Sequence, residues 1–136
     1  MAAPSDPTPR LPHAAPFLML DRVVDVGDKS GVFSKHVTGA DPCVAADGTL
    51  PAAFLLEALA QGGGALVAAM DEAAPTIGYL ASVDDFRVHG PARVGDTLRV
   101  EVEIVRHFAS ATLFRGRALV GDRLVAEGRF TLAQPR

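Results

Sequence analysis

The chain has 136 residues, a formal net charge of −3 and one cysteine. This length supports one domain with one core, and a single cysteine excludes both an internal disulfide and a cysteine-based zinc site. An apolar share of 49% with a charged share of 21% is typical of soluble globular proteins. The acidic balance gives no reason to expect a nucleic-acid partner, and one free thiol fits a cytoplasmic protein.

The first residues are rich in proline and lack the basic region and apolar core of a signal peptide. We expect residues 1–9 to form a disordered tail. A single domain is predicted over 10–134.

Short β-rich segments surround one long predicted helix. Strands are expected over 18–26 and 31–38, with a hairpin turn at Gly27-Asp28. The helix is predicted to follow from about Pro51 to Glu72. Further strands are expected over 76–83, 86–89, 98–104, 111–120 and 124–132. Because apolar and charged residues alternate along 98–104, that strand is expected to have one wet face.

The predicted helix is apolar on nearly all its faces. Between Pro51 and Met70 its only polar side chains are Glu57 and Gln61, and their spacing of four places them on one face. We expect an antiparallel sheet to wrap this helix on nearly all sides in an α+β fold. The glycines at 62–64 are expected where another backbone comes close. Polar residues and glycines interrupt the apolar run, so no membrane span is expected.

An ionised carboxylate in an apolar helix costs several kcal/mol unless it is paired or hydrogen-bonded. Two interpretations of Glu57 therefore stay open at this point. It is either a functional carboxylate or a core glutamate that is bonded to a backbone amide.

Four blocks of sequence occur in the order found in FabZ-type β-hydroxyacyl-acyl-carrier-protein dehydratases. The opening L-P-H-A-A-P-F-L-M-L-D-R-V at 11–23 resembles that family's L-P-H-R-x-P-F-L-L-V-D-R-V. The other blocks are K-H-V-T-G-A-D-P at 35–42, L-E-A-L-A-Q at 56–61 and R-V-H-G-P-A-R-V-G-D-T-L at 87–98. The resemblance covers about 11–132 and implies the hot-dog fold, in which an antiparallel sheet wraps one long helix.

The resemblance also implies a reaction. Such enzymes eliminate water from a 3-hydroxyacyl thioester, carried on the phosphopantetheine of acyl carrier protein, at a dimer interface. A loop histidine removes the α-proton, and a helix carboxylate of the other subunit, matched here by Glu57, handles the departing hydroxyl. No metal and no other cofactor is implied, and coenzyme A is an alternative carrier. The substrate-binding residues that we expect are Gln61, Leu50, Pro51, Ala52, Phe54 and His13.

The family's loop histidine is missing from this chain. Counted from Pro42, Asp47 stands in its place, in a loop about four residues shorter. The segment D-G-T-L-P at 47–51 is similar to dehydratase-like proteins of aryl-polyene gene clusters, which implies a place in polyene or fatty-acid biosynthesis. We expect the other histidines, His36, His89 and His107, to be exposed or structural, and Cys43 to fill apolar space.

Three functions remain open. In a dehydratase, Glu57 acts as acid or base and Asp47 as a weak base or orienting group, since an ordinary aspartate has a pKa near 4. In a hot-dog thioesterase, Asp47 and Glu57 activate water or attack the thioester. In a non-catalytic subunit, the chain pairs with a histidine-bearing homologue. Asp47 is alternatively only a turn or helix cap.

The expected partners are acyl carrier protein or acyl-CoA and a second hot-dog subunit, in a homodimer or a heterodimer. Candidate residues for docking the acidic carrier are Arg10, Arg22, Arg87 and Arg93.

Overall fold

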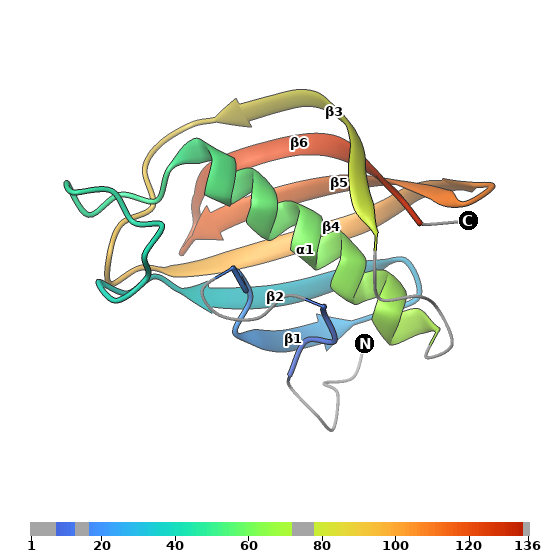
Figure 1. Ribbon diagram of the computed structural model, residues 1–136, viewed down its shortest axis with the longest axis horizontal. Helices are drawn as coiled ribbons and strands as arrows, with labels where there is room; N and C mark the ends of the chain where they lie inside the picture. The colour runs from blue at the N-terminus through green and yellow to red at the C-terminus, as the bar shows by residue number, and fades with distance from the viewer. Residues whose placement is uncertain (1–7, 13–16, 72–77, 135–136) are drawn as a thin grey trace.

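The computed structural model describes residues 8–12, 17–71 and 78–134. These described residues form one helix and six strands, whose bounds are β1 Arg22–Val26, β2 Ser30–His36, α1 Ala52–Met70, β3 Tyr79–Val88, β4 Thr97–Phe108, β5 Ala111–Val120 and β6 Arg123–Ala133. The strands form one antiparallel sheet in the order β1-β2-β4-β5-β6-β3. The helix crosses one face of this sheet (Figure 1), as the sequence predicts.

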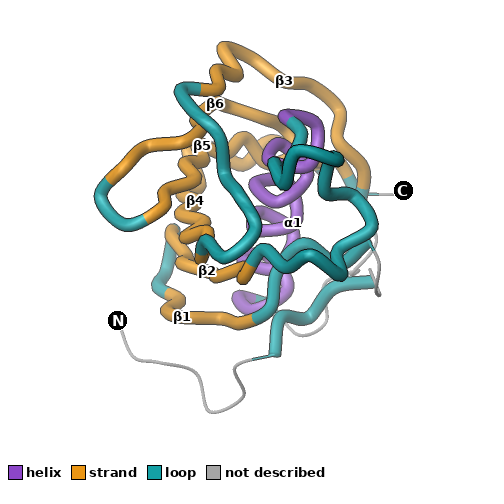
Figure 2. The backbone as a smooth tube through the Cα atoms, turned by 90° about the vertical axis from the view of Figure 1, so that its left-hand side faces the viewer, coloured by secondary structure: helices purple, strands orange, loops and turns teal. Residues whose placement is uncertain are grey.

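The core lies between α1 and the inner face of the sheet. Leu55, Leu59 and Leu66 of the helix are fully buried, together with Phe33 from β2 and Phe114 from β5. Each such side chain contributes roughly 1.5–3 kcal/mol relative to exposure. The helix is long and apolar enough to cross a membrane by length and composition, but more than half of it is buried inside the protein. It is therefore a core helix, which the view along the sheet shows well (Figure 2).

Two of the helix glycines allow α1 to approach the sheet closely. A Cβ on Gly62 would lie 3.0 Å from Val100 Cγ1, and a Cβ on Gly63 would lie 2.9 Å from Phe130 Cε2. Distances this short leave no room for a methyl group without movement of the sheet side chains. The close approach was expected, although the nearest atoms belong to sheet side chains rather than to backbone.

The structure corrects three sequence expectations. The segments 76–83 and 86–89 do not form two strands, because the described residues from Tyr79 onward belong to a single strand, β3. Its pairing with β6 continues across an irregularity between Asp84 and Arg87, where Asp85 has a φ of 53°. A bulge of this kind bends a strand without ending it. The first strand begins only at Arg22.

The third correction concerns how much of the helix the sheet covers. The sheet curves around α1, from β1 at one edge to β3 at the other (Figure 2), as the hot-dog resemblance implies. These edges do not meet, so the sheet does not reach nearly all sides of the helix. Part of the remaining surface is covered by the N-terminal segment, where Arg10 Nη1 donates to Ala68 O at 2.8 Å. Pro9, at the end of the predicted tail, is buried. Residues 1–7 of that tail and Glu72 lie outside the described residues.

Candidate functional site

The two polar residues of the helix contact each other, as their spacing predicts. Gln61 Nε2 donates to Glu57 Oε1 at 2.9 Å and to Phe17 O at 2.7 Å. Gln61 Oε1 accepts from Met19 N at 2.7 Å. The Gln61 side chain is only 2% exposed, so its amide is fixed by backbone groups on one side and orients the half-buried Glu57 carboxylate on the other.

A cavity of about 120 Å³ borders this pair. It lies between one stripe of α1, the beginning of β3 and the N-terminal segment. Its lining residues are Leu11, Pro12, Glu57, Ala60, Gln61, Gly64, Gly78, Tyr79, Leu80 and Leu132. Most of these are apolar, with one carboxylate and one amide. The volume is below the roughly 300–1,000 Å³ of typical ligand pockets.

Apart from Glu57 and Gln61, none of the residues that line this cavity was predicted as a site residue from the sequence. Leu11 and Leu132 come from opposite ends of the chain, and only the tertiary fold brings them beside α1. One local signal was present, because a glycine at position 64 is unfavourable in a helix and calls for a structural reason.

The helix start is a separate region from this cavity. Pro51 is the N-cap residue, and its carbonyl accepts from Phe54 N at 2.9 Å. Leu50 is buried and its N–H donates to Ala92 O at 2.9 Å, whereas Ala52 is exposed. These predicted substrate-binding residues do not line the Glu57 cavity. His13, the remaining predicted binding residue, lies outside the described residues.

Asp47 is exposed in the loop before the helix. Its Oδ1 accepts from Thr49 Oγ1 at 2.6 Å and from Thr49 N at 3.0 Å. These bonds to Thr49, side chain first, hold the pKa of Asp47 below its ordinary value. Asp47 is not among the residues that line the Glu57 cavity. The structure therefore does not bring the two predicted catalytic carboxylates together around one cavity of this chain.

A buried lysine anchors the same loop. Lys35 is 6% exposed, and its Nζ lies 3.0 Å from Asp41 Oδ1 and 3.8 Å from Asp21 Oδ1. Burial raises the pKa of Asp41, but hydrogen bonds from Thr38 and Lys35 lower it more, so the net direction is down. Burial, and then the negative charge of Asp41, raise the pKa of the Cys43 thiol. Cys43 is half-buried against the core.

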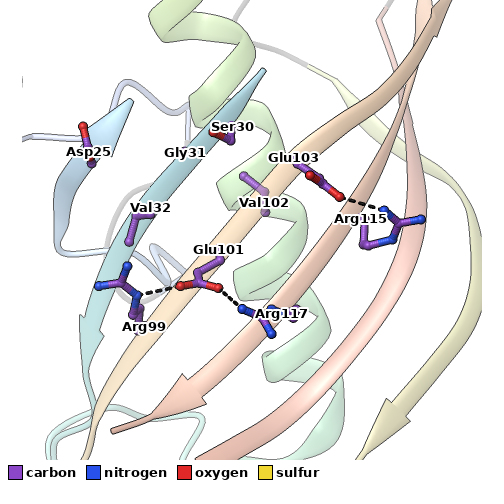
Figure 3. Close-up of a pocket in the computed structure, with 10 residues that line it drawn as sticks. All are labelled: Asp25, Ser30, Gly31, Val32, Arg99, Glu101, Val102, Glu103, Arg115 and Arg117. Carbon is purple, nitrogen blue, oxygen red and sulfur yellow. Dashed lines mark hydrogen bonds and ion pairs between the residues drawn. The ribbon is translucent and has the colours of Figure 1, made fainter. Parts of the chain in front are cut away.

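A larger groove, of about 570 Å³, lies on the outer face of the sheet. Figure 3 shows its charged side chains in front of the strands, with the helix behind them. Glu101 accepts from Arg99 Nε at 2.8 Å and from Arg117 Nη2 at 2.5 Å. Burial raises the pKa of Glu101, but the hydrogen bonds and charges of these two arginines lower it by more, so the net direction is down. Glu103 likewise accepts from Arg115 Nη1 at 2.7 Å, whereas Asp25 Oδ1 is buried among the described residues without a hydrogen-bond partner. The groove contains no part of the Glu57 network.

The described histidines are exposed and bond to nearby side chains. The ring of His36 lies 3.2 Å from Thr97 Oγ1, and that of His107 lies 3.0 Å from Thr112 Oγ1. His89 Nε2 lies 2.6 Å from Glu127 Oε2. None of the three lines the Glu57 cavity. Within the described ranges, no group of three or more His, Cys, Asp or Glu residues is placed to hold a metal ion.

The sequence and fold match known dehydratases. The model of the ApeP-like family, described as ApeP dehydratase, matches residues 5–136. The 3-hydroxyacyl-[acyl-carrier-protein] dehydratase FabZ of Caulobacter vibrioides is 36% identical over 129 residues, which cover 89% of this chain and 80% of that protein.

Two solved structures show the same fold. The dehydratase heterocomplex ApeI:P from Xenorhabdus doucetiae matches with a TM-score of 0.86 at 24% identity, over 93% of this chain and 88% of that chain. A hypothetical thioesterase protein with coenzyme A from Streptococcus pneumoniae matches with a TM-score of 0.68 at 16% identity, over 82% of this chain and 83% of that one. At these identities the likeness concerns the fold alone, and it confirms the hot-dog architecture.

The family model and the FabZ relative each cover nearly the whole chain, and both describe dehydratases. The chain therefore belongs to the ApeP-like dehydratase family, is related to FabZ, and is dehydratase-like in function.

Proposed function

We propose that this chain is a subunit of a dehydratase that acts on 3-hydroxyacyl thioesters, with Glu57 as its acid–base group. The observation that carries the proposal is the Glu57 carboxylate, which the buried Gln61 amide holds at a cavity lined mainly by apolar side chains. An apolar cavity with one oriented carboxylate suits an aliphatic substrate that must exchange a proton at a single position.

The reaction needs one group that removes a proton and another group that donates one. A base removes the α-proton, the electrons form the double bond between the α- and β-carbons, and the β-hydroxyl leaves. The Glu57 carboxyl donates its proton to that hydroxyl, so water is released and the carboxylate remains. Negative charge that develops on the thioester oxygen requires fixed donors. We assign this role to backbone amides at the beginning of the equivalent helix in the second subunit, because the start of α1 lies apart from the Glu57 cavity of its own chain and Phe54 N donates to Pro51 O.

The base must have another source than Asp47. That side chain is exposed, is bonded to Thr49, and has a lowered pKa, so it is a weaker proton acceptor than an ordinary aspartate. We infer that the base comes from a second hot-dog subunit that carries the loop histidine. A histidine has a pKa suited to this task near neutral pH. The sequence prediction that Asp47 replaces the histidine is the competing hypothesis.

The surface beside the cavity supports such a partner. The strand β3 is a sheet edge, and nearly all its residues are exposed. Tyr79 at its beginning is 59% exposed, and Leu80 and Val83 are also exposed large apolar residues. Unpaired edges with apolar side chains are surfaces to which another strand adds. A partner strand on β3 would complete the wall of the cavity at Tyr79 and Leu80.

The ApeI:P structure is a dehydratase heterocomplex, which favours a related but different subunit as the partner, with a homodimer as the alternative. The substrate would be carried by acyl carrier protein, as for FabZ, or by coenzyme A, in cytoplasmic fatty-acid or polyene biosynthesis. We assign no metal or other cofactor. Arg22, Arg87 and Arg93 are exposed and are available to the acidic carrier.

The test is turnover measured by mass spectrometry. The purified chain, alone and mixed with a histidine-bearing hot-dog homologue, is incubated with a 3-hydroxyacyl thioester on acyl carrier protein. We expect the chain alone to lose no water from the substrate, and the mixture to lose one water faster than the partner alone does. Water loss by the chain alone would contradict the need for a partner base and would favour Asp47. Release of free acid would instead indicate a thioesterase, and an unchanged rate on adding this chain to an active partner would indicate a non-catalytic subunit.

A further inference from the structure

The three consecutive glycines of α1 do not share one structural reason. A Cβ on Gly62 or Gly63 would press against sheet side chains at 3.0 Å or 2.9 Å. Among the described residues, a Cβ on Gly64 would meet Leu11 Cδ2 alone, at 3.7 Å, which is ordinary van der Waals contact. Its backbone is helical, so no positive φ calls for glycine there. Packing against the described part of the chain therefore explains the first two glycines and leaves the third unexplained.

A helix glycine that packing does not require is unfavourable. Glycine in a helix interior costs about 1 kcal/mol relative to alanine, and alanine would fit at this position. Gly64 lines the Glu57 cavity, so we look to the cavity for the advantage that offsets this loss of helix stability. Glu57, Gln61 and Gly64 follow one another at helix spacings of four and three, so they form one stripe along α1.

Gly64 lies two helical turns beyond Glu57, which is about 10 Å along the helix axis. Leu11 lies next to Gly64, and Tyr79, Leu80 and Leu132 also line the cavity. These groups offer apolar contacts to whatever extends past the carboxylate. When Glu57 is at the β-hydroxyl of a substrate, the part of an acyl chain that reaches Gly64 is its distal end.

We propose that Gly64 is a specificity-determining residue, which leaves open the far end of the Glu57 cavity for the distal methylene groups of a long acyl chain. This inference rests on the proposed function, since it concerns the substrate of the same site. A side chain at position 64 would project into the space that the acyl chain needs. Each methylene that the cavity buries should raise affinity about fourfold, so a blocked far end penalises long chains and spares short ones.

The test is binding of unreactive acyl-pantetheine amides, butyryl and decanoyl, to the full chain together with its partner. We expect the wild type to favour decanoyl. In Gly64→Leu, decanoyl affinity should fall at least tenfold, while butyryl affinity stays within about twofold. Gly64→Ala shows whether a loss of affinity comes from misfolding. It should be more stable than the wild type towards urea and yet bind the decanoyl amide severalfold more weakly. Ala69→Leu, on the exposed surface of the same helix, is the matched control and should change neither affinity.

The outcomes distinguish a failure of the inference about Gly64 from a failure of the proposed function. If Gly64→Leu lowers the affinity for both amides equally, or for neither, Gly64 does not determine chain length, and the inference is overturned while the proposed function stands. If the wild type binds neither amide, the proposed function fails, and the inference fails with it.

Discussion

Replacement of Gln61 by leucine should remove the hydrogen bonds that hold the Gln61 amide between Glu57 and the N-terminal segment. Leucine has nearly the size of glutamine, so no large cavity forms and the effect is one of hydrogen bonding. The Met19 N–H loses its acceptor in a buried position, which costs about 1–3 kcal/mol. Phe17 O loses a donor, but it belongs to an exposed residue that water can reach. Loss of the bond to the Glu57 carboxylate adds about 1 kcal/mol.

We therefore expect the free energy of unfolding to fall by about 2–4 kcal/mol. In a domain of this size such a loss lowers Tm by roughly 6–16 °C. Urea and thermal unfolding of Gln61→Leu measure the effect. Glu57→Gln is the matched control, because an amide oxygen at position 57 still accepts from Gln61 Nε2. That variant should change stability by less than about 1 kcal/mol. If Gln61→Leu is as stable as the wild type, the assigned hydrogen-bond network is wrong.

Three further predictions concern the surroundings of the site. Lys35→Met should lower stability by about 2 kcal/mol at neutral pH, because Asp41 loses its buried cation. The folded pKa of Asp41 is lowered. Its contribution to the free energy of unfolding is therefore complete above its unfolded pKa of about 3.9 and is lost as the pH falls through its folded pKa. Urea titrations at acidic pH should show a smaller loss of stability in Lys35→Met than in the wild type. Gly63→Ala should destabilise by about 1–3 kcal/mol through contact with Phe130, and a stable variant would contradict the close packing of α1. Arg117→Leu should change neither the turnover nor, by more than about 1 kcal/mol, the stability, and a loss of turnover would place function in the outer groove.

The sequence predicted the features that depend on local pattern. The spacing of Glu57 and Gln61 placed them on one helix face, and their side chains are bonded. The break that was expected in β3 is wrong. Two adjacent aspartates interrupt the apolar alternation there, but a bulge at Asp85 lets the pairing with β6 continue. That pairing depends on backbone hydrogen bonds to β6, which lies much later in the chain, so the local sequence around Asp85 does not predict it.

The walls of the cavity depend on tertiary structure. Leu11 and Leu132 contact the helix region only because the N-terminal segment and the last strand flank α1, and no periodicity predicts this. The sequence left two sources of the base open, Asp47 and a histidine-bearing second subunit, because a local pattern does not show which groups meet across an interface between chains. Asp47 could be placed in the loop from sequence, but its bonds to Thr49 and its lowered pKa required the folded loop.

The central claim is that the Glu57 carboxyl group exchanges the proton of the departing hydroxyl. Glu57→Gln, assembled with a histidine-bearing partner and given a 3-hydroxyacyl thioester on acyl carrier protein, tests it most directly. Because the amide keeps the bond from Gln61 but cannot donate a carboxyl proton, we predict that water loss measured by mass spectrometry slows by about 10²–10⁴-fold while the complex stays intact. Turnover at the wild-type rate in a folded, assembled variant would contradict the account.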